Sequence, residues 1–100
     1  MAITNFGNKI ADDIFHNAKS KKLPEALWTR ARQLLYIMDS TDNIKALENA
    51  AHPPSTRAHH LKGNMKGRMA IDIHKTIGWR ITFKFENGAF KDVKIENYHT

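Results

Sequence analysis

The most regular segment of this 100-residue chain is residues 79–88, Trp-Arg-Ile-Thr-Phe-Lys-Phe-Glu-Asn-Gly. Over residues 79–85 apolar and polar side chains alternate, which is the pattern of a strand with one buried face. Asn87-Gly88 follows directly, and this pair favours a two-residue type I′ turn because both of its positions take positive φ. Val93 and Ile95 then supply the apolar members of another strand. The sequence therefore predicts a β-hairpin in its C-terminal part.

The segments before the hairpin predict further strands and three helices. Residues 68–74 alternate in the same way, and residues 59–62 are expected to form a short strand. Further upstream, apolar residues recur at spacings of three and four, which is typical of helices. We expect these helices over about residues 6–18, from Pro24 onward, and over about residues 43–50. Helices followed by an antiparallel sheet predict an α+β fold, with the N-terminal helices packed on one face of a C-terminal, mainly antiparallel β-sheet.

Length and composition predict a single domain over residues 1–100, since the chain is too short for a second core. No apolar run approaches the ~20 residues that a membrane span needs. The polar N-terminal region does not resemble a signal peptide. The chain has no cysteine, which excludes disulfides and thiolate metal sites. We therefore expect a cytoplasmic protein that does not associate with membranes.

The positive charge of the chain is concentrated in one segment. The formal net charge is +6, and residues 55–84 contain seven lysines and arginines against one acidic residue, Asp72. A concentrated basic segment is typical of proteins that bind a phosphate backbone. Strand alternation places Arg80, Thr82 and Lys84 on the face opposite the core. The sequence thus predicts a basic, titratable sheet face that could hold RNA.

The histidines indicate what such a face could do. The chain has six, and histidine is the natural general acid or base near neutral pH. RNA carries its own nucleophile, the 2′-hydroxyl, so cleavage needs a base, an acid and cations that stabilise the charged phosphorane. We expect no cofactor and no metal site, because His59 and His60 are neighbours on a strand and point to opposite faces. The candidates for proton transfer and for phosphate binding are His59, Tyr98, His99, Lys62, Lys75 and Arg80.

Five short motifs, in their order and spacing, resemble the HigB family of toxins, a branch of the RelE superfamily. They cover about residues 59–99, and the preceding helices agree with the family in order and length. The motifs are His59-His60-Leu61-Lys62-Gly63, Lys66-Gly67, Ile71-Asp72-Ile73, Trp79-Arg80-Ile81-Thr82-Phe83 and Tyr98-His99.

The resemblance implies an activity and a set of partners. HigB-like toxins are ribosome-dependent mRNA interferases, which cut mRNA in the ribosomal A site. A HigA-type antitoxin with a helix-turn-helix domain neutralises them, and the complex represses its own operon, so the antitoxin makes the contact with operator DNA. The family's catalytic positions fall on His59, Lys62, Arg80, Tyr98 and His99. The residues that we expect to contact RNA around them are Lys66, Arg68, His74, Lys75 and Lys84.

One departure from the family pattern bears on the mechanism. The family usually has an acidic residue before Tyr98-His99, and this chain has Asn97. An asparagine cannot act as a base, so the role of that carboxylate is either missing or taken over by another group. Strict alternation also places Tyr98 on the face opposite His99, so we expect the chain to bend where the two share a site.

Three alternatives to an RNA-cleaving toxin stay open from the sequence. The same superfamily fold includes ParE-type gyrase poisons, which lack the basic and histidine-bearing set present here. A plain nucleic-acid-binding module would use the basic face for salt-sensitive binding without cleavage. A toxin that has lost its activity is the third, and Asn97 is the residue that suggests it.

Overall fold

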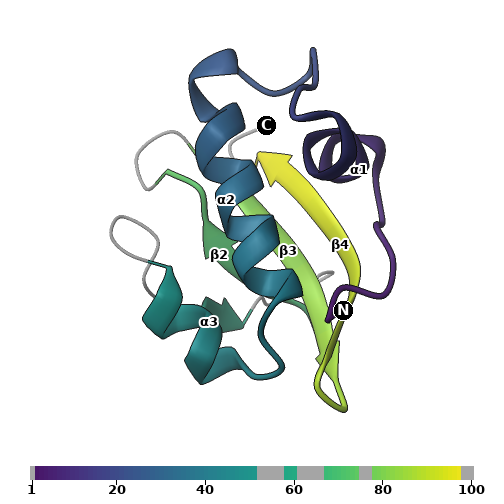
Figure 1. Ribbon diagram of the computed structural model, residues 1–100, viewed down its shortest axis with the longest axis vertical. Helices are drawn as coiled ribbons and strands as arrows, with labels where there is room; N and C mark the ends of the chain where they lie inside the picture. The colour runs from purple at the N-terminus through teal and green to yellow at the C-terminus, as the bar shows by residue number, and fades with distance from the viewer. Residues whose placement is uncertain (1, 52–57, 61–66, 75–77, 98–100) are drawn as a thin grey trace.

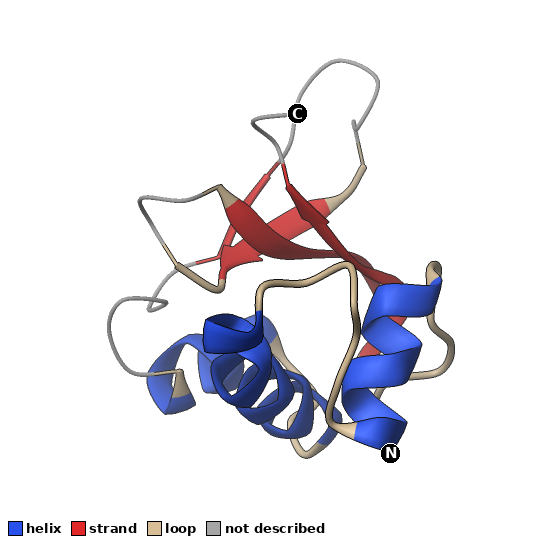
Figure 2. Ribbon diagram, turned by 90° about the horizontal axis from the view of Figure 1, so that it is seen from above, coloured by secondary structure: helices blue, strands red, loops and turns tan. Residues whose placement is uncertain are grey.

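The computed structural model describes residues 2–51, 58–60, 67–74 and 78–97 of the chain. Within these residues, helices lie on one face of a four-stranded sheet (Figures 1 and 2). The strand order follows the chain, and every neighbouring pair is antiparallel. This arrangement confirms the predicted α+β fold. The elements are α1 (Lys9–Asn17), a 3₁₀ helix η1 (Glu25–Leu27), α2 (Trp28–Asp39), α3 (Ile44–Ala50), β1 (Ala58–His60), β2 (Met69–Asp72), β3 (Trp79–Glu86) and β4 (Ala89–Asn97).

The hairpin between β3 and β4 forms as the sequence predicts. Asn87 has a φ of 51° and Gly88 a φ of 79°, so both turn positions are left-handed, as a type I′ turn requires. Pairing of the two strands extends from the turn to Trp79 opposite Asn97. This is the longest strand pairing in the described sheet.

β4 departs from strict alternation at Asp92, which has a φ of 50°. The register of β4 against β3 shifts by one residue at this point, as in a β-bulge. The extra residue lets Phe90 and Val93, three positions apart, both be buried in the core. The alternation in the sequence predicts Val93 and Ile95 as the apolar members of this strand but not Phe90, because a strict period of two assigns Phe90 to the outside.

The core lies between the sheet and the helical layer. Phe83 of β3 and Phe90 of β4 pack edge to face, with ring centroids 5.2 Å apart. Burying one large apolar side chain of this kind contributes about 1.5–3 kcal/mol. The other large, fully buried side chains in the described part of the chain are Ile14, Leu23, Leu34, Leu35, Met38, Leu47, Ile71, Ile73, Ile81 and Ile95.

The N-terminal segment, residues 2–7, adds to the sheet in a way that the sequence analysis does not foresee. It runs parallel to β4, with bridges from Ile3 to Phe90 and from Phe6 to Val93. The Gly7 N–H donates to the carbonyl of Val93 at 2.8 Å. The segment thereby covers an edge strand whose backbone groups would otherwise be unpaired. For the same reason α1 begins at Lys9, whereas the predicted helix begins near Phe6.

The other two helices differ less from the prediction. Pro24 precedes η1, and the α-helix begins only at Trp28, whose indole N–H donates to the carbonyls of Ser20 and Leu23 (3.0 and 2.7 Å). α3 coincides with the predicted helix, with Asn43 as its N-cap. Across the described ranges, the longest helices fall short of the length and apolar character needed to cross a membrane.

Asn8 joins α1 to the sheet. Its Oδ1 accepts hydrogen bonds from the N–H of Ala11 (3.1 Å) and of Ile95 (3.3 Å). Its Nδ2 donates to the carbonyl of Ile95 at 3.0 Å. One side chain therefore caps a helix and extends the pairing of β4, so it sets how the helical layer meets the sheet.

Replacing Asn8 with alanine should cost more stability than the same change at the other asparagine cap. Asn43→Ala removes one exposed cap bond, from the Ala46 N–H, and an exposed bond to the neighbouring Asp42 carboxylate, and should cost about 1 kcal/mol. Asn8→Ala also removes two bonds to β4 and should cost about 2 kcal/mol. Urea unfolding of the two variants measures the difference, and equal losses would contradict the linking role of Asn8.

Candidate functional site

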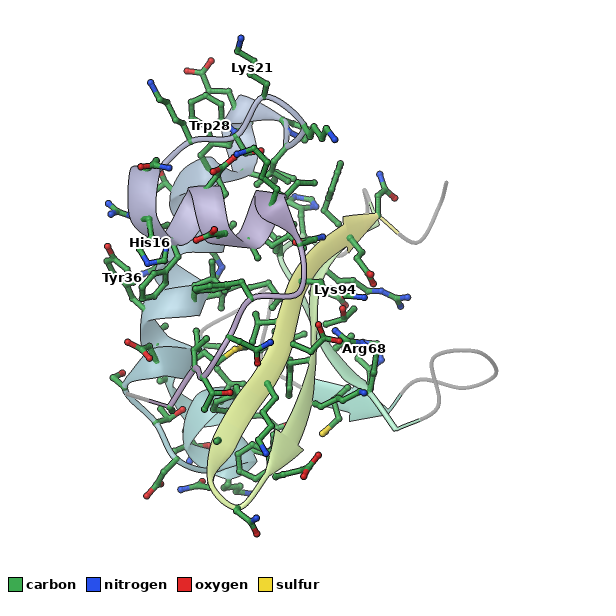
Figure 3. All side chains as sticks on the ribbon, turned by 90° about the vertical axis from the view of Figure 1, so that its right-hand side faces the viewer. His16, Lys21, Trp28, Tyr36, Arg68 and Lys94 are labelled. Atoms are coloured by element: carbon green, nitrogen blue, oxygen red, sulfur yellow. The ribbon has the colours of Figure 1, made fainter. Side chains whose placement is uncertain are left out.

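The face of the sheet that points away from the helices, here called the outer face, carries two rows of paired side chains. Figure 3 shows Arg68 and Lys94 on this side, with His16 and Tyr36 of the helical layer on the other. The register defines the rows, because directly paired residues share a face. The first row is His59, Ala70, Thr82 and Lys94, and the second is Asp72, Arg80 and Glu96.

Arg80 has a central place on the outer face. It is half-buried on β3, and its paired neighbours are Asp72 on β2 and Glu96 on β4. Lys84 is exposed further along the same strand and pairs with Lys91. The structure thus brings a guanidinium, ammonium groups and two carboxylates onto one surface, which suits a phosphate ester and the proton transfers around it.

Thr82 and Arg68 form a buried cluster within the outer face. The Thr82 side chain is fully buried, although it alternates with the core residues of β3. Its hydroxyl accepts from Nη2 of Arg68 at 2.8 Å and donates to Oε2 of Glu96 at 3.1 Å. Arg68 also donates through Nη1 to Oδ2 of Asp92 (2.8 Å) and through Nη2 to the Asp92 carbonyl (2.7 Å). The cluster links the start of β2 to β3 and β4.

This cluster changes the role of Arg68. Its place in the basic segment predicts contact with RNA, whereas in the structure it is only 6% exposed. Both of its terminal nitrogens donate to groups of the protein itself. Alternation alone gives the face of a residue and does not say whether neighbours cover it. We therefore assign Arg68 to holding the outer face together.

His59 stands on β1, at the edge of the outer face. Its Nε2 lies 3.9 Å from Oδ1 of Asp72, and its side chain is 48% exposed. The preceding residue fixes the strand to the helical layer, because the Ala58 N–H donates to Oε2 of Glu48 on α3 at 2.7 Å. A half-exposed histidine beside a carboxylate is well placed to exchange a proton with a bound ligand.

The remaining predicted residues divide between described and undescribed parts of the chain. His74 is exposed just after β2, where its backbone N–H donates to the Trp79 carbonyl. Lys84 is exposed on the outer face. The predicted residues that lie outside the described ranges are Lys62, Lys66, Lys75, Tyr98 and His99.

The structure adds outer-face residues that the sequence analysis passes over. Lys94 and Glu96 alternate with Val93 and Ile95 on β4, so the signal was present in the same period-two pattern. Lys91 joins them only because the bulge at Asp92 shifts the register. Among the residues that the structure describes, no three histidine, aspartate or glutamate side chains are grouped so that they could hold a metal ion.

Comparisons with known proteins cover nearly the whole chain. Residues 4–99 match the model of a family described as the RelE-like toxin of the type II toxin-antitoxin system HigB. The chain is also 28% identical over 97 residues to a Proteus vulgaris protein named Endoribonuclease HigB. The aligned region covers 97% of this chain and 99% of that protein. These matches confirm the resemblance that the short motifs carry.

Neutralising Asp92 should destabilise the outer face. Asp92→Asn keeps the size and tolerates the left-handed φ, but it leaves the buried Arg68 guanidinium without its anionic partner, at a cost of about 2 kcal/mol. Glu86→Gln makes the same charge change in an exposed pair with Lys91 (3.6 Å) and should cost less than about 0.5 kcal/mol. Chemical denaturation compares the two variants. A loss at Asp92 no greater than that at Glu86 would show that the buried pair does not stabilise the fold.

Proposed function

The chain belongs to the HigB-like family of RelE-like toxins of type II toxin–antitoxin systems, and from this premise we propose that it is a ribosome-dependent endoribonuclease. As the toxin of its system, it cuts mRNA and so inhibits translation. The observation that carries the proposal is the outer face, where Arg80 lies between Asp72 and Glu96 on a surface that also carries Lys84, Lys91 and Lys94. The name of the Proteus vulgaris relative, Endoribonuclease HigB, supports the same activity.

The reaction follows from the chemistry of RNA. A base removes the proton of the 2′-hydroxyl, the 2′-oxygen attacks the adjacent phosphorus, and the 5′-oxygen leaves with a proton from an acid. Arg80 and Lys62 bind the phosphate and stabilise the charge that develops on it, with the guanidinium able to contact two oxygens. In this proposal His99 is the leading candidate for the acid. His59 and Tyr98 are the candidates for the base.

The wider outer face holds the RNA backbone. Three lysines, Lys84, Lys91 and Lys94, lie on β3 and β4. Each can bind an RNA phosphate other than the scissile phosphate. Lys66, His74 and Lys75 extend the set in the proposal. Contacts of this kind position a nucleic acid without reading its sequence, so they suit an enzyme whose substrate is presented by the ribosome.

The partners follow from the family and from this site. A type II toxin has a protein antitoxin as its partner. We propose a HigA-like antitoxin with a helix-turn-helix domain, through which the complex reaches operator DNA. The toxin itself acts in the cytoplasm, on mRNA in the ribosomal A site.

Removing the central guanidinium should abolish most of the activity. We expect Arg80→Ala to lower the rate of mRNA cleavage in a translation reaction at least about 100-fold, since it takes away a preorganised donor to the phosphorane. Lys21→Ala, which removes a cation from the helical layer at the top of Figure 3, should cut at the wild-type rate. Primer extension on a defined mRNA measures both.

Four results would contradict the proposal. One is the absence of any ribosome-dependent cut by the wild-type protein. Another is equal cutting by wild type and Arg80→Ala. The third is inhibition of gyrase supercoiling without RNA cleavage, which would identify a ParE-like poison. Salt-sensitive binding to free nucleic acid with no cleavage in any context would instead indicate a binding module.

A further inference from the structure

The two residues that end β4 lie on opposite faces of the sheet. Asn97 pairs with Trp79, which packs against the core. Glu96 pairs with Arg80 on the outer face. The carboxylate next to the C-terminal Tyr98-His99 pair is thus absent at position 97 and present one residue earlier, on the side where the phosphate would bind.

We propose that Glu96 is a catalytic residue, the general base that accepts the proton of the RNA 2′-hydroxyl. The inference rests on the proposed endoribonuclease function and deepens it. It replaces the open choice between His59 and Tyr98 with a carboxylate whose position the structure defines.

The hydrogen bond from Thr82 holds this carboxylate in place. The Thr82 hydroxyl donates to Oε2 of Glu96 at 3.1 Å, and the same oxygen of Thr82 accepts from the buried Arg68 guanidinium. Glu96 is half-buried, so part of its side chain remains accessible to a ligand. One carboxylate oxygen is therefore held by Thr82, and the carboxylate can still accept a proton from a bound substrate.

The position of Glu96 relative to Arg80 fits the geometry of the reaction. Paired residues on adjacent strands have Cβ atoms about 4.5–5.5 Å apart, so a phosphate bound by Arg80 lies next to the Glu96 carboxylate. In-line attack needs the base and the acid on opposite sides of the phosphorus. Glu96 is on β4, to one side of Arg80, and His59 is on β1, two strands away on the other side.

The proposed step balances as a transesterification. Glu96 takes the 2′-hydroxyl proton while the 2′-oxygen forms a bond to phosphorus. The bond from phosphorus to the 5′-oxygen breaks, and that oxygen takes a proton from a histidine. This acid is His99, the leading candidate above, or His59, which Glu96 releases from the role of base. The products are a 2′,3′-cyclic phosphate and a 5′-hydroxyl. Glu96 and the histidine then return to their starting protonation states by exchange with water.

Glu96→Gln tests the inference because it keeps the size and the acceptor for Thr82 but cannot take the proton. The experiment measures single-turnover cleavage of a defined mRNA on programmed ribosomes at saturating toxin, together with ribosome binding and the thermal unfolding temperature. Glu86→Gln, an exposed glutamate at the end of β3, makes the same charge change as a control. Loss of a general base should slow Glu96→Gln about 100-fold or more, with binding and unfolding unchanged.

The outcomes separate the inference from the proposed function. If wild type cuts and Glu96→Gln cuts within about threefold of it, which is far less than the loss of a base predicts, Glu96 is not the base and the endoribonuclease assignment stands. A slower Glu96→Gln whose loss is fully explained by weaker ribosome binding also overturns the inference. If wild type makes no ribosome-dependent cut, the proposed function fails and the inference falls with it.

Discussion

The outer face depends on the buried guanidinium of Arg68. This group donates to the carboxylate and the carbonyl of Asp92 and to the hydroxyl of Thr82, so it ties the start of β2 to the strands of the hairpin. Charge-assisted hydrogen bonds of this kind are each worth about 1.5–3 kcal/mol. The bulge at Asp92 turns Lys91 onto the outer face and Phe90 into the core, and the left-handed φ that it requires is one that aspartate tolerates. The packing of the hairpin and the orientation of its charged side chains therefore both depend on Asp92.

The two faces of the sheet carry residues with different roles, one in folding and the other in the proposed function. Its inner face carries the apolar side chains that the helices cover, and its outer face carries His59, Arg80 and Glu96, which the proposed reaction uses. Because successive residues of a strand point to opposite sides, the apolar residues of β3 face the core while Arg80 and Lys84 face outward. A rigid sheet suits the proposed catalysis because Arg80 and Glu96 are held on strands whose spacing is fixed by hydrogen bonds.

Local pattern explains why the architecture, and the placement of Arg80 and Lys84 on the outer face, follow from the sequence. The alternation over residues 79–85 and the Asn87-Gly88 turn are properties of adjacent residues, and both appear in the structure as the sequence predicts. What the sequence analysis misses depends on contacts between distant residues. The pairing of the N-terminal segment with β4 and the burial of Arg68 are of this kind, since no local period reveals which neighbour will cover an edge or a side chain. The bulge that moves Phe90 inward is another, because it appears only when two strands are aligned.

In the proposed reaction the outer face positions an RNA phosphate for attack by the adjacent 2′-hydroxyl. A decisive experiment first maps the cut on a defined mRNA bound to ribosomes, and then repeats the reaction with a 2′-deoxynucleotide on the 5′ side of the mapped bond. We expect the unsubstituted mRNA to yield a 2′,3′-cyclic phosphate and a 5′-hydroxyl, and the substituted mRNA to stay uncut at that bond. Cleavage of the substituted mRNA at the same bond would rule out attack by the 2′-hydroxyl, because another nucleophile would then have to attack the phosphorus.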